Sequence, residues 1–332
     1  MKIHSMFDTV VGQTIPKTRL TESILSAEAG KEMLSPLVIG EAGKGKTHIS
    51  NAYITALKAL GFDVLSFSSP EEFRSGGESY DSLVQLFKDS PRYAIFIDEC
   101  HLLNHKATIR MDKIKNFIMK ALDKNNQGKE IRFDDNLIMT FDRKRGSIVL
   151  GTNFPDLLDK SGAFQSRCDT IVLDDYSKPD LVKILQAMLK RVGFQPANEG
   201  TLGMIAACGR GTARPMEHIV EQLRISSNAT GGKNTINQDD VIRALKLSKM
   251  YPVGLEPWEV NILERTEQPI RDNVLSQLIP QIERTSFNKG KGYLIAQGFA
   301  APTPQGFQRT DKGLRYLKAA KENGFNIDIK LK

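Results

Sequence analysis

One eight-residue segment constrains the fold more than any other part of the chain. Residues 40–47 read GEAGKGKT, which fits G-x-x-x-x-G-K-[ST], and they lie between the apolar run 37–39 and a helical stretch from about Thr47 to Leu60. In that position the backbone N–H groups of a glycine-rich turn converge on phosphate oxygens, and the helix N-terminus adds partial positive charge. The flanking strand and helix argue against an ordinary glycine-rich turn. We therefore predict that Lys46 contacts the β- and γ-phosphates of a nucleotide and that Thr47 holds Mg²⁺.

A second segment, PRYAIFIDECH at 91–101, ends an apolar run in two adjacent acids, Asp98 and Glu99. Alone, this pattern fits any strand that runs into a polar loop. Beside a phosphate-binding loop, such a strand end supplies an acid for the Mg²⁺ shell and a base for the attacking water. The two motifs together predict ATP hydrolysis, with Asp98 in the first role and Glu99 in the second. A zinc site built from Cys100, His101 and His105 is the weaker interpretation, because polar residues on an exposed helical turn are far commoner.

Composition limits the class of protein. The chain has 332 residues, 40% hydrophobic and 26% charged, which is typical of a globular protein with two or three domains. No apolar run is long enough to span a bilayer, and the N-terminus lacks a signal peptide's apolar core, so we expect a cytoplasmic protein without a membrane partner. Three widely separated cysteines indicate reduced thiols. The net charge of +7 permits a polyanionic partner without proving one.

The first half of the chain alternates short apolar strands with helical patterns. The runs at 37–39, 64–67, 93–97 and 148–150 predict an α/β fold with a parallel sheet covered on both faces. Residues 131–149 resemble a β-hairpin that projects before the last of these strands. We predict a large ATPase domain over 1–175, including that hairpin, and a helical lid domain over 176–248 that starts at a Ser177–Asp180 cap.

Residues 249–332 form a separate small unit, entered through a linker at 249–256. An amphipathic helix is predicted from Val274, Leu275, Leu278, Ile279 and Ile282. Two strands near 298–303 and 307–310 follow, joined by the turn 304–306, and this order is the outline of a winged helix. Residues 251–332 have 12 Lys or Arg against 9 Asp or Glu, a net charge of +3, and there is no acid between residues 284 and 310. The predicted DNA contacts are therefore Arg284, Lys289, Lys291 and Arg309, although an ordinary solvated basic face is the alternative.

The order and wording of these segments resemble an AAA+ ATPase and, more narrowly, the RuvB family of hexameric motors that drive branch migration of Holliday junctions. FDTVVGQ at 7–13 resembles the family's opening segment, GTN at 151–153 its sensor 1, QSRC at 165–168 its arginine-finger segment, and RGTAR at 210–214 its sensor 2. The resemblance implies that Val11 lines the adenine pocket and that Asn153, or Thr152 beside it, orients the water or senses the γ-phosphate. It also implies that Arg167 reaches the ATP of the neighbouring subunit.

By the same resemblance Arg214 contacts the γ-phosphate in cis. The residues predicted to bind ATP are Val11, Gly40, Glu41, Ala42, Gly43, Lys44, Gly45, Lys46, Thr47, His48 and Arg214.

The C-terminal segments are similar to RuvB in particular. GYLIAQGFAAPTPQG at 292–306 resembles the family's winged helix, and PVGLEPWE at 252–259 resembles the junction that precedes it. This implies a homo-oligomeric ring of six subunits that translocates the duplex arms of a four-way junction. A RuvA-like partner is implied at the hairpin 131–149, with Leu137, Ile138 and Met139 at its tip. The chain departs from the family at Gln305, where the wing usually carries a basic residue, and in the polar segment 285–291.

Two other functions fit part of the sequence. The sequence QSRC resembles the arginine-finger segment of a clamp-loader subunit more than that of RuvB. Clamp loaders, however, end in a helical collar rather than a winged helix. An AAA+ adaptor that coats DNA and recruits a recombinase or initiator is the third possibility, and the presence of Glu99 and Arg167 argues for hydrolysis instead.

Overall fold

The computed structural model describes residues 6–74, 78–104, 108–134, 137–158, 162, 164–229, 232, 234–277, 279 and 282–326. The chain forms two compact units, Met1–Asp180 and Leu181–Lys332. Among the described residues, no helix has the length and apolar character needed to cross a membrane. His105, one of the three residues considered for zinc, lies outside the described ranges.

The first unit is built on a five-stranded sheet in the order β2-β3-β6-β1-β7, with every pairing parallel. This confirms the predicted α/β fold, and each of the four apolar runs is a strand. The strands of the sheet are β1 (Pro36–Ile39), β2 (Asp63–Phe67), β3 (Tyr93–Ile97), β6 (Gly146–Thr152) and β7 (Asp169–Val172). The helices and 3₁₀ turns of the unit are α1 (Thr14–Glu28), α2 (Lys46–Ala59), η2 (Pro70–Phe73), α3 (Glu78–Asp89), η3 (Cys100–Asn104), α4 (Ile109–Ala121), η4 (Lys124–Asn126), α5 (Pro155–Leu158) and η5 (Gln165–Arg167).

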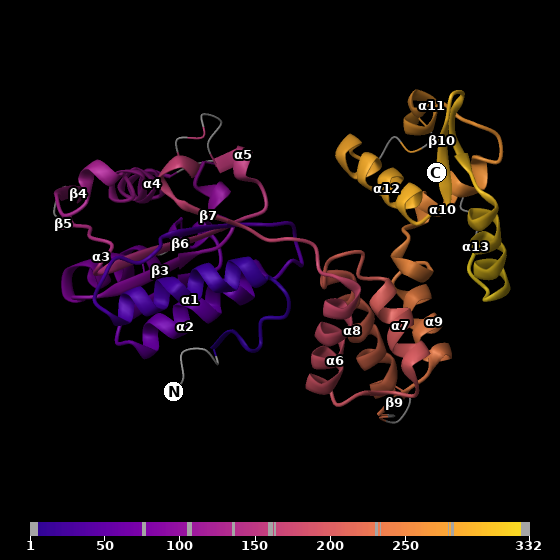
Figure 1. Ribbon diagram of the computed structural model, residues 1–332, viewed down its shortest axis with the longest axis horizontal. Helices are drawn as coiled ribbons and strands as arrows, with labels where there is room; N and C mark the ends of the chain where they lie inside the picture. The colour runs from indigo at the N-terminus through magenta and orange to yellow at the C-terminus, as the bar shows by residue number, and fades with distance from the viewer. Residues whose placement is uncertain are drawn as a thin grey trace. The chain divides into compact units, whose positions relative to one another are not determined.

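Successive side chains of the central strands enter two different cores. Ile95 and Ile97 of β3 join a cluster that contains residues of α3 and α4, whereas Ala94 and Phe96 join a cluster with residues of α1 and α2. This alternation follows from the two-residue period of a strand. Helices therefore cover both faces of the sheet (Figure 1). The carboxyl ends of β1, β3 and β6 lie side by side at one edge of the sheet.

The hairpin is shorter and less exposed than the sequence predicts. β4 (Glu130–Asp134) pairs antiparallel with β5 (Leu137–Thr140), and residues 146–149, predicted to belong to the hairpin, are part of β6 in the central sheet. Leu137 and Met139 are buried with α3 and α4, so of the three predicted tip residues Ile138 alone is exposed, by 56%. The prediction erred because it counted apolar residues without assigning alternate ones to opposite faces. Residues 135–136 lie outside the described residues.

The second unit begins with helices and ends in a helix–hairpin arrangement. Its elements are α6 (Lys178–Arg191), β8 (Gln195–Pro196), α7 (Glu199–Ala207), α8 (Arg214–Ala229), β9 (Thr235–Ile236), α9 (Gln238–Leu247), η6 (Pro252–Gly254), α10 (Pro257–Arg265), α11 (Asp272–Gln277), α12 (Arg284–Ala296), β10 (Ala300–Thr303), β11 (Gly306–Arg309) and α13 (Asp311–Glu322). β10 and β11 form the predicted antiparallel hairpin. The single amphipathic helix predicted through Ile282 is wrong, since α11 ends at Gln277 and neither Ile279 nor Ile282 is helical; Leu278 lies outside the described residues. The sequence has a proline at 280, and the residue before a proline disfavours helical geometry.

A buried ion pair joins the α7–α8 turn to α10. Arg210 makes two hydrogen bonds to the carboxylate of Glu259, at 2.7 and 2.8 Å, and Glu259 has no exposed surface. The Arg210 guanidinium also stacks 3.8 Å from the ring centroid of Tyr293. Burial raises the pKa of Glu259 above its ordinary value, while the hydrogen bonds from Arg210 oppose that rise.

We predict that Arg210→Met lowers the free energy of unfolding by about 3–5 kcal/mol at pH 7, because it leaves a buried carboxylate without its cation. A carboxyl group whose pKa is raised in the folded state lowers the free energy of unfolding of the protein as the pH rises through that pKa. The loss should therefore be smaller at pH 5 than at pH 7. Urea unfolding followed by the fluorescence of the one tryptophan, Trp258, measures it locally. Arg243→Met, which breaks an exposed pair with Asp240, is the control, and an equal loss at both pH values would contradict the prediction.

Candidate functional site

The phosphate-binding loop joins β1 to α2, as the motif predicts. Gly43 and Gly45 have φ values of +83° and +85°, which residues other than glycine rarely adopt. A Cβ on Gly45 would lie 2.4 Å from the hydroxyl of Tyr176, and that hydroxyl donates a hydrogen bond of 3.0 Å to the carbonyl of Lys44. The glycines thus let the loop curl tightly while Tyr176 holds it in place.

Lys46 lies at the base of this loop with 6% of its surface exposed. Its ammonium donates to the carbonyl of Glu41, at 3.3 Å, and to the side-chain oxygen of Asn153 at the end of β6. Lys44, in contrast, pairs with Asp175 at 2.8 Å. Of these two lysines, Lys46 is the one that the structure directs toward the strand ends.

Thr47 and Asp98 offer oxygen ligands that suit Mg²⁺. The Thr47 hydroxyl lies 2.5 Å from the Asp98 carboxylate, and Asp98 is 8% exposed. Mg²⁺ prefers oxygen and is commonly held by one or two protein groups together with phosphates. In the part of the chain that the structure describes, no group of three or more His, Cys, Asp or Glu is placed to hold a metal. The donor set therefore fits Mg²⁺ bound together with a nucleotide, and the described residues provide no zinc cluster around Cys100.

Glu99 is held in an unusual backbone conformation. Its φ is +48°, in the left-handed region that non-glycine residues seldom occupy, which is typical of functional sites. Its carboxylate accepts a hydrogen bond of 3.3 Å from the amide of Asn153 and lies 3.5 Å from the ring of His101. The base candidate is thus held from two sides.

His101 is a site residue that the sequence interpretation missed. It was expected on an exposed turn, but it is buried, with 8% exposure, and its ring is 3.1 Å from the Thr152 hydroxyl. Thr152 is therefore turned toward His101, while Asn153 contacts both Lys46 and Glu99. The available signal was its place two residues after Glu99. His101 belongs to the turn η3, and its ring contacts both Thr152 of β6 and the Glu99 carboxylate.

The absence of a side chain at Gly151 leaves room for the Asp98 carboxylate. A Cβ there would lie 2.5 Å from Oδ1 of Asp98. We predict that Gly151→Ala displaces this carboxylate and lowers kcat for ATP hydrolysis by about tenfold or more, since a misplacement of 1 Å can cost on the order of 100-fold. Gly203→Ala, with no neighbour within 4 Å, is the control. Steady-state kinetics at several Mg²⁺ concentrations measure the effect, and unchanged kinetics would contradict it.

The opening segment lies along the same edge. Val11 is half-buried, and the Gln13 side chain bonds to both the N–H and the carbonyl of Asp174, at 3.2 and 2.8 Å. His48 of α2 lies 3.1 Å from the carbonyl of Thr9. These contacts place residues 9–13 beside the start of α2, and the role of Val11 in an adenine pocket stays a prediction.

The two predicted arginines belong to different units of the chain. Arg167 is in η5, 32% exposed, and its Nε donates 3.2 Å to Asp123. Arg214 is the first residue of α8 in the second unit and is exposed, and its role there stays a prediction.

The four predicted DNA contacts differ in exposure. Arg284 and Lys289 of α12 are exposed, whereas Lys291 pairs with Asp272. Arg309 has only 10% of its side chain exposed and donates to the carbonyls of Leu263 and Glu264. Arg284 and Lys289 therefore offer the most accessible positive charge of the four.

Comparisons with known proteins show that the chain is similar to ATPases of one family and to RuvB proteins. Residues 36–176 match the family model described as "ATPase family associated with various cellular activities (AAA)". The chain is 25% identical over 320 residues to the Holliday junction branch migration complex subunit RuvB of Thermotoga petrophila, covering 94% of this chain and 90% of that protein. It is also 25% identical to RuvB of Methanoregula boonei, with 95% and 91% covered. The solved Thermotoga maritima RuvB Holliday junction branch migration motor matches with a TM-score of 0.63 at 23% identity, covering 94% of this chain and 96% of that one.

Proposed function

We propose, from the AAA domain at residues 36–176 and a likeness to RuvB proteins that extends over 94% of the chain, that this protein is an ATP-hydrolysing DNA motor of RuvB type. It would translocate duplex DNA and so drive branch migration of four-way junctions. The observation that carries the proposal is the convergence of Lys46, the Thr47–Asp98 pair and Glu99 at one edge of the sheet.

The geometry supports a specific division of labour for ATP hydrolysis. Lys46 would neutralise the β- and γ-phosphates, and Thr47 with Asp98 would hold Mg²⁺, which polarises the phosphoryl oxygens. Glu99 would accept a proton from the attacking water. Asn153, which contacts both Lys46 and Glu99, is better placed than Thr152 to sense the γ-phosphate.

Two arginines would complete the site. Arg167 would act on the nucleotide of a neighbouring subunit, which requires subunits that adjoin one another in a ring, and six subunits is the number that the family resemblance implies. Arg214 would contact the γ-phosphate in its own subunit. The exposed Arg284 and Lys289 of α12 would grip phosphates of duplex DNA without reading its sequence. All of this would take place in the cytoplasm, where the three free thiols stay reduced.

A synthetic four-way junction tests the function. The chain should dissociate the junction with ATP and Mg²⁺, alone or with a RuvA-type protein, and Glu99→Gln should bind it without dissociating it. If ATP is hydrolysed while the junction stays intact under every condition, branch migration is wrong and the chain is an AAA ATPase of another kind. Clamp loading and recruitment of a recombinase would then be tested.

The hairpin is the proposed contact for a RuvA-like partner. We predict that Ile138→Asp leaves basal ATP hydrolysis unchanged but removes most of the stimulation by such a partner, because a central apolar contact contributes about 2 kcal/mol or more, roughly 30-fold in affinity. Leu25→Asp, at an exposed apolar residue of α1, is the control. Full stimulation of the Ile138→Asp variant would show that the partner binds elsewhere.

A further inference from the structure

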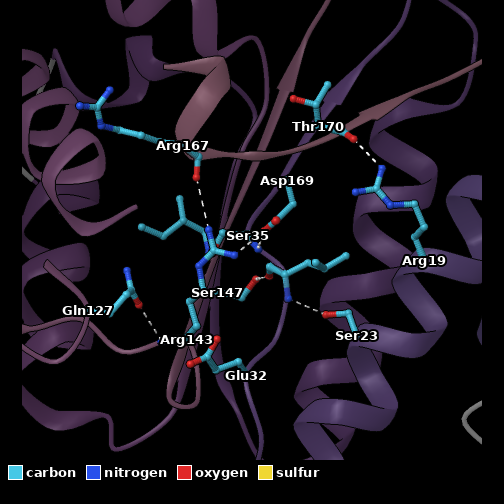
Figure 2. A network of polar contacts seen from close by, with 12 residues as sticks. Arg19, Ser23, Glu32, Ser35, Gln127, Arg143, Ser147, Arg167, Asp169 and Thr170 are labelled. Carbon is cyan, nitrogen blue, oxygen red and sulfur yellow. Dashed lines mark hydrogen bonds and ion pairs between the residues drawn. The ribbon is translucent and has the colours of Figure 1, made fainter. Parts of the chain in front are cut away.

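The two ends of the β4–β5 hairpin are tied together at its base. The N–H of Gly128, before β4, donates 2.9 Å to the carbonyl of Phe141, after β5. The Gln127 side chain accepts a hydrogen bond of 3.3 Å from the N–H of Arg143 (Figure 2). Hydrogen bonds therefore join the segments 123–128 and 141–143, and we call these two segments together the base of the hairpin.

One side of this base holds the backbone of the Arg167 segment. The guanidinium of Arg143, whose side chain is 11% exposed, pairs with Asp169 at 2.8 Å and donates 3.3 Å to the carbonyl of Arg167 (Figure 2). The same Asp169 oxygen accepts 2.8 Å from the N–H of Ser35, and the carbonyl of Arg143 accepts from the N–H of Met33. Arg143 thus ties residue 167 to the segment that leads into β1.

The other side of the base holds the side chain of Arg167. Asp123 caps η4 by accepting 2.9 Å from the N–H of Asn125, and its second oxygen accepts from Nε of Arg167 at 3.2 Å. The backbone N–H of Asn125 and then the Arg167 guanidinium lower the pKa of Asp123, so the carboxylate stays ionised. The contact with Asp123 uses Nε, one of the five N–H groups of an arginine. It fixes the direction in which the two terminal nitrogens extend.

We propose that Asp123 and Arg143 are positioning residues for Arg167, holding it by its side chain and by its carbonyl from the two ends of one hairpin. The inference rests on the proposed action of Arg167 on a neighbour's nucleotide. Two contacts, one to the side chain and one to the backbone carbonyl, restrict the orientation of a long arginine side chain more than a single contact does. A displacement of about 1 Å in such a group can cost on the order of 100-fold in rate. Movement of the hairpin in one subunit would then change ATP turnover in the next.

Mixed rings test this directly. A recipient subunit carries Arg167→Ala and keeps its own nucleotide site, and a donor carries Lys46→Ala and keeps its arginine. Each alone should be inactive, and the mixture should hydrolyse ATP where a donor faces a recipient. Adding Arg143→Lys or Asp123→Asn to the donor should lower the kcat of the mixture by about tenfold or more without changing KM, because the recipient's own site is unaltered. Adding either change to the recipient should alter kcat less than twofold.

The conservative changes keep the fold while removing the contact. Lysine retains the charge beside Asp169 but lacks the fork that also reaches the carbonyl of Arg167. Asparagine retains the oxygen that caps η4. Arg145→Lys in the donor is the matched control, because Arg145 is exposed in the same loop and bonds to Pro91 rather than to the Arg167 segment.

The outcomes distinguish failure of the proposed action of Arg167 in trans from failure of the proposed positioning role of Asp123 and Arg143. If an unmodified donor fails to activate the recipient, Arg167 does not act in trans and that part of the proposed function is wrong. If it does activate, but the donor changes have no effect or have the same effect in the recipient, Asp123 and Arg143 do not position Arg167 and the inference is overturned.

Discussion

Glu99→Gln should lower kcat for ATP hydrolysis by about 100- to 10,000-fold while nucleotide binding stays within twofold, because a positioned general base contributes on that order. Glutamine keeps the size of the side chain and can still bond to Asn153, but it cannot accept the proton of the attacking water. Residue 99 has a left-handed φ of +48°, and replacing glutamate by glutamine should not change the cost of that backbone conformation. The fold should therefore be retained. Binding of a fluorescent ATP analogue and steady-state hydrolysis measure the two quantities separately.

Glu71→Gln is the control for this change, since Glu71 is an exposed acid of the same unit whose side chain is 58% exposed. Its kinetics should equal those of the wild type. If Glu99→Gln hydrolyses ATP at a rate within tenfold of the wild type, another group activates the water. His101, which lies 3.5 Å from the Glu99 carboxylate, would then be the next residue to replace.

Arg167→Ala should lower kcat by about 1,000- to 100,000-fold in the assembled ring, the effect of an arginine that stabilises transition-state charge on a transferred phosphoryl group. Because the arginine would act on a neighbour, the subunit's own affinity for ATP should change little. Arg167→Lys should recover only a small part of the rate, since lysine keeps the charge but lacks the planar fork that Asp123 orients through Nε. The measurement is kcat per subunit at a protein concentration where the ring is assembled, which sedimentation verifies.

Arg224, which pairs with Glu221 on the surface of α8, provides the control as Arg224→Ala. Its kcat should equal that of the wild type. A loss of less than about tenfold in Arg167→Ala rings that remain assembled would mean that no arginine finger is provided from this segment.

The sequence was sufficient for the parts of this protein that depend on local patterns. The strand–loop–helix order around GEAGKGKT, the acids after β3 and the wing hairpin β10–β11 all form where they were predicted. Each of these is specified within a few residues, by apolar runs of strand length, by glycines that must adopt positive φ, or by a tight turn.

Predictions failed where the outcome depends on which face a side chain occupies. The sequence shows Leu137, Ile138 and Met139 as one apolar run, but packing against α3 and α4 buries the first and the third. Arg309 appears as one more positive charge, yet the fold directs its guanidinium to the carbonyls of Leu263 and Glu264. Charge and hydropathy are properties of a residue, whereas exposure depends on what packs against it.

The sequence by itself determined the parallel sheet, the glycine-rich loop between β1 and α2 and the position of Asp98 and Glu99 after β3, because these follow from short patterns with a direct steric reason. Only the tertiary structure decided that His101 supports Glu99, that Asn153 rather than Thr152 faces Lys46, and that Asp123 and Arg143 hold Arg167. These contacts join residues 24 to 107 positions apart, with the exception of the neighbouring pair Glu99 and His101. Contacts across such distances arise from the order of strands in the sheet, which brings the ends of β1, β3 and β6 to one edge, and no local pattern records that order.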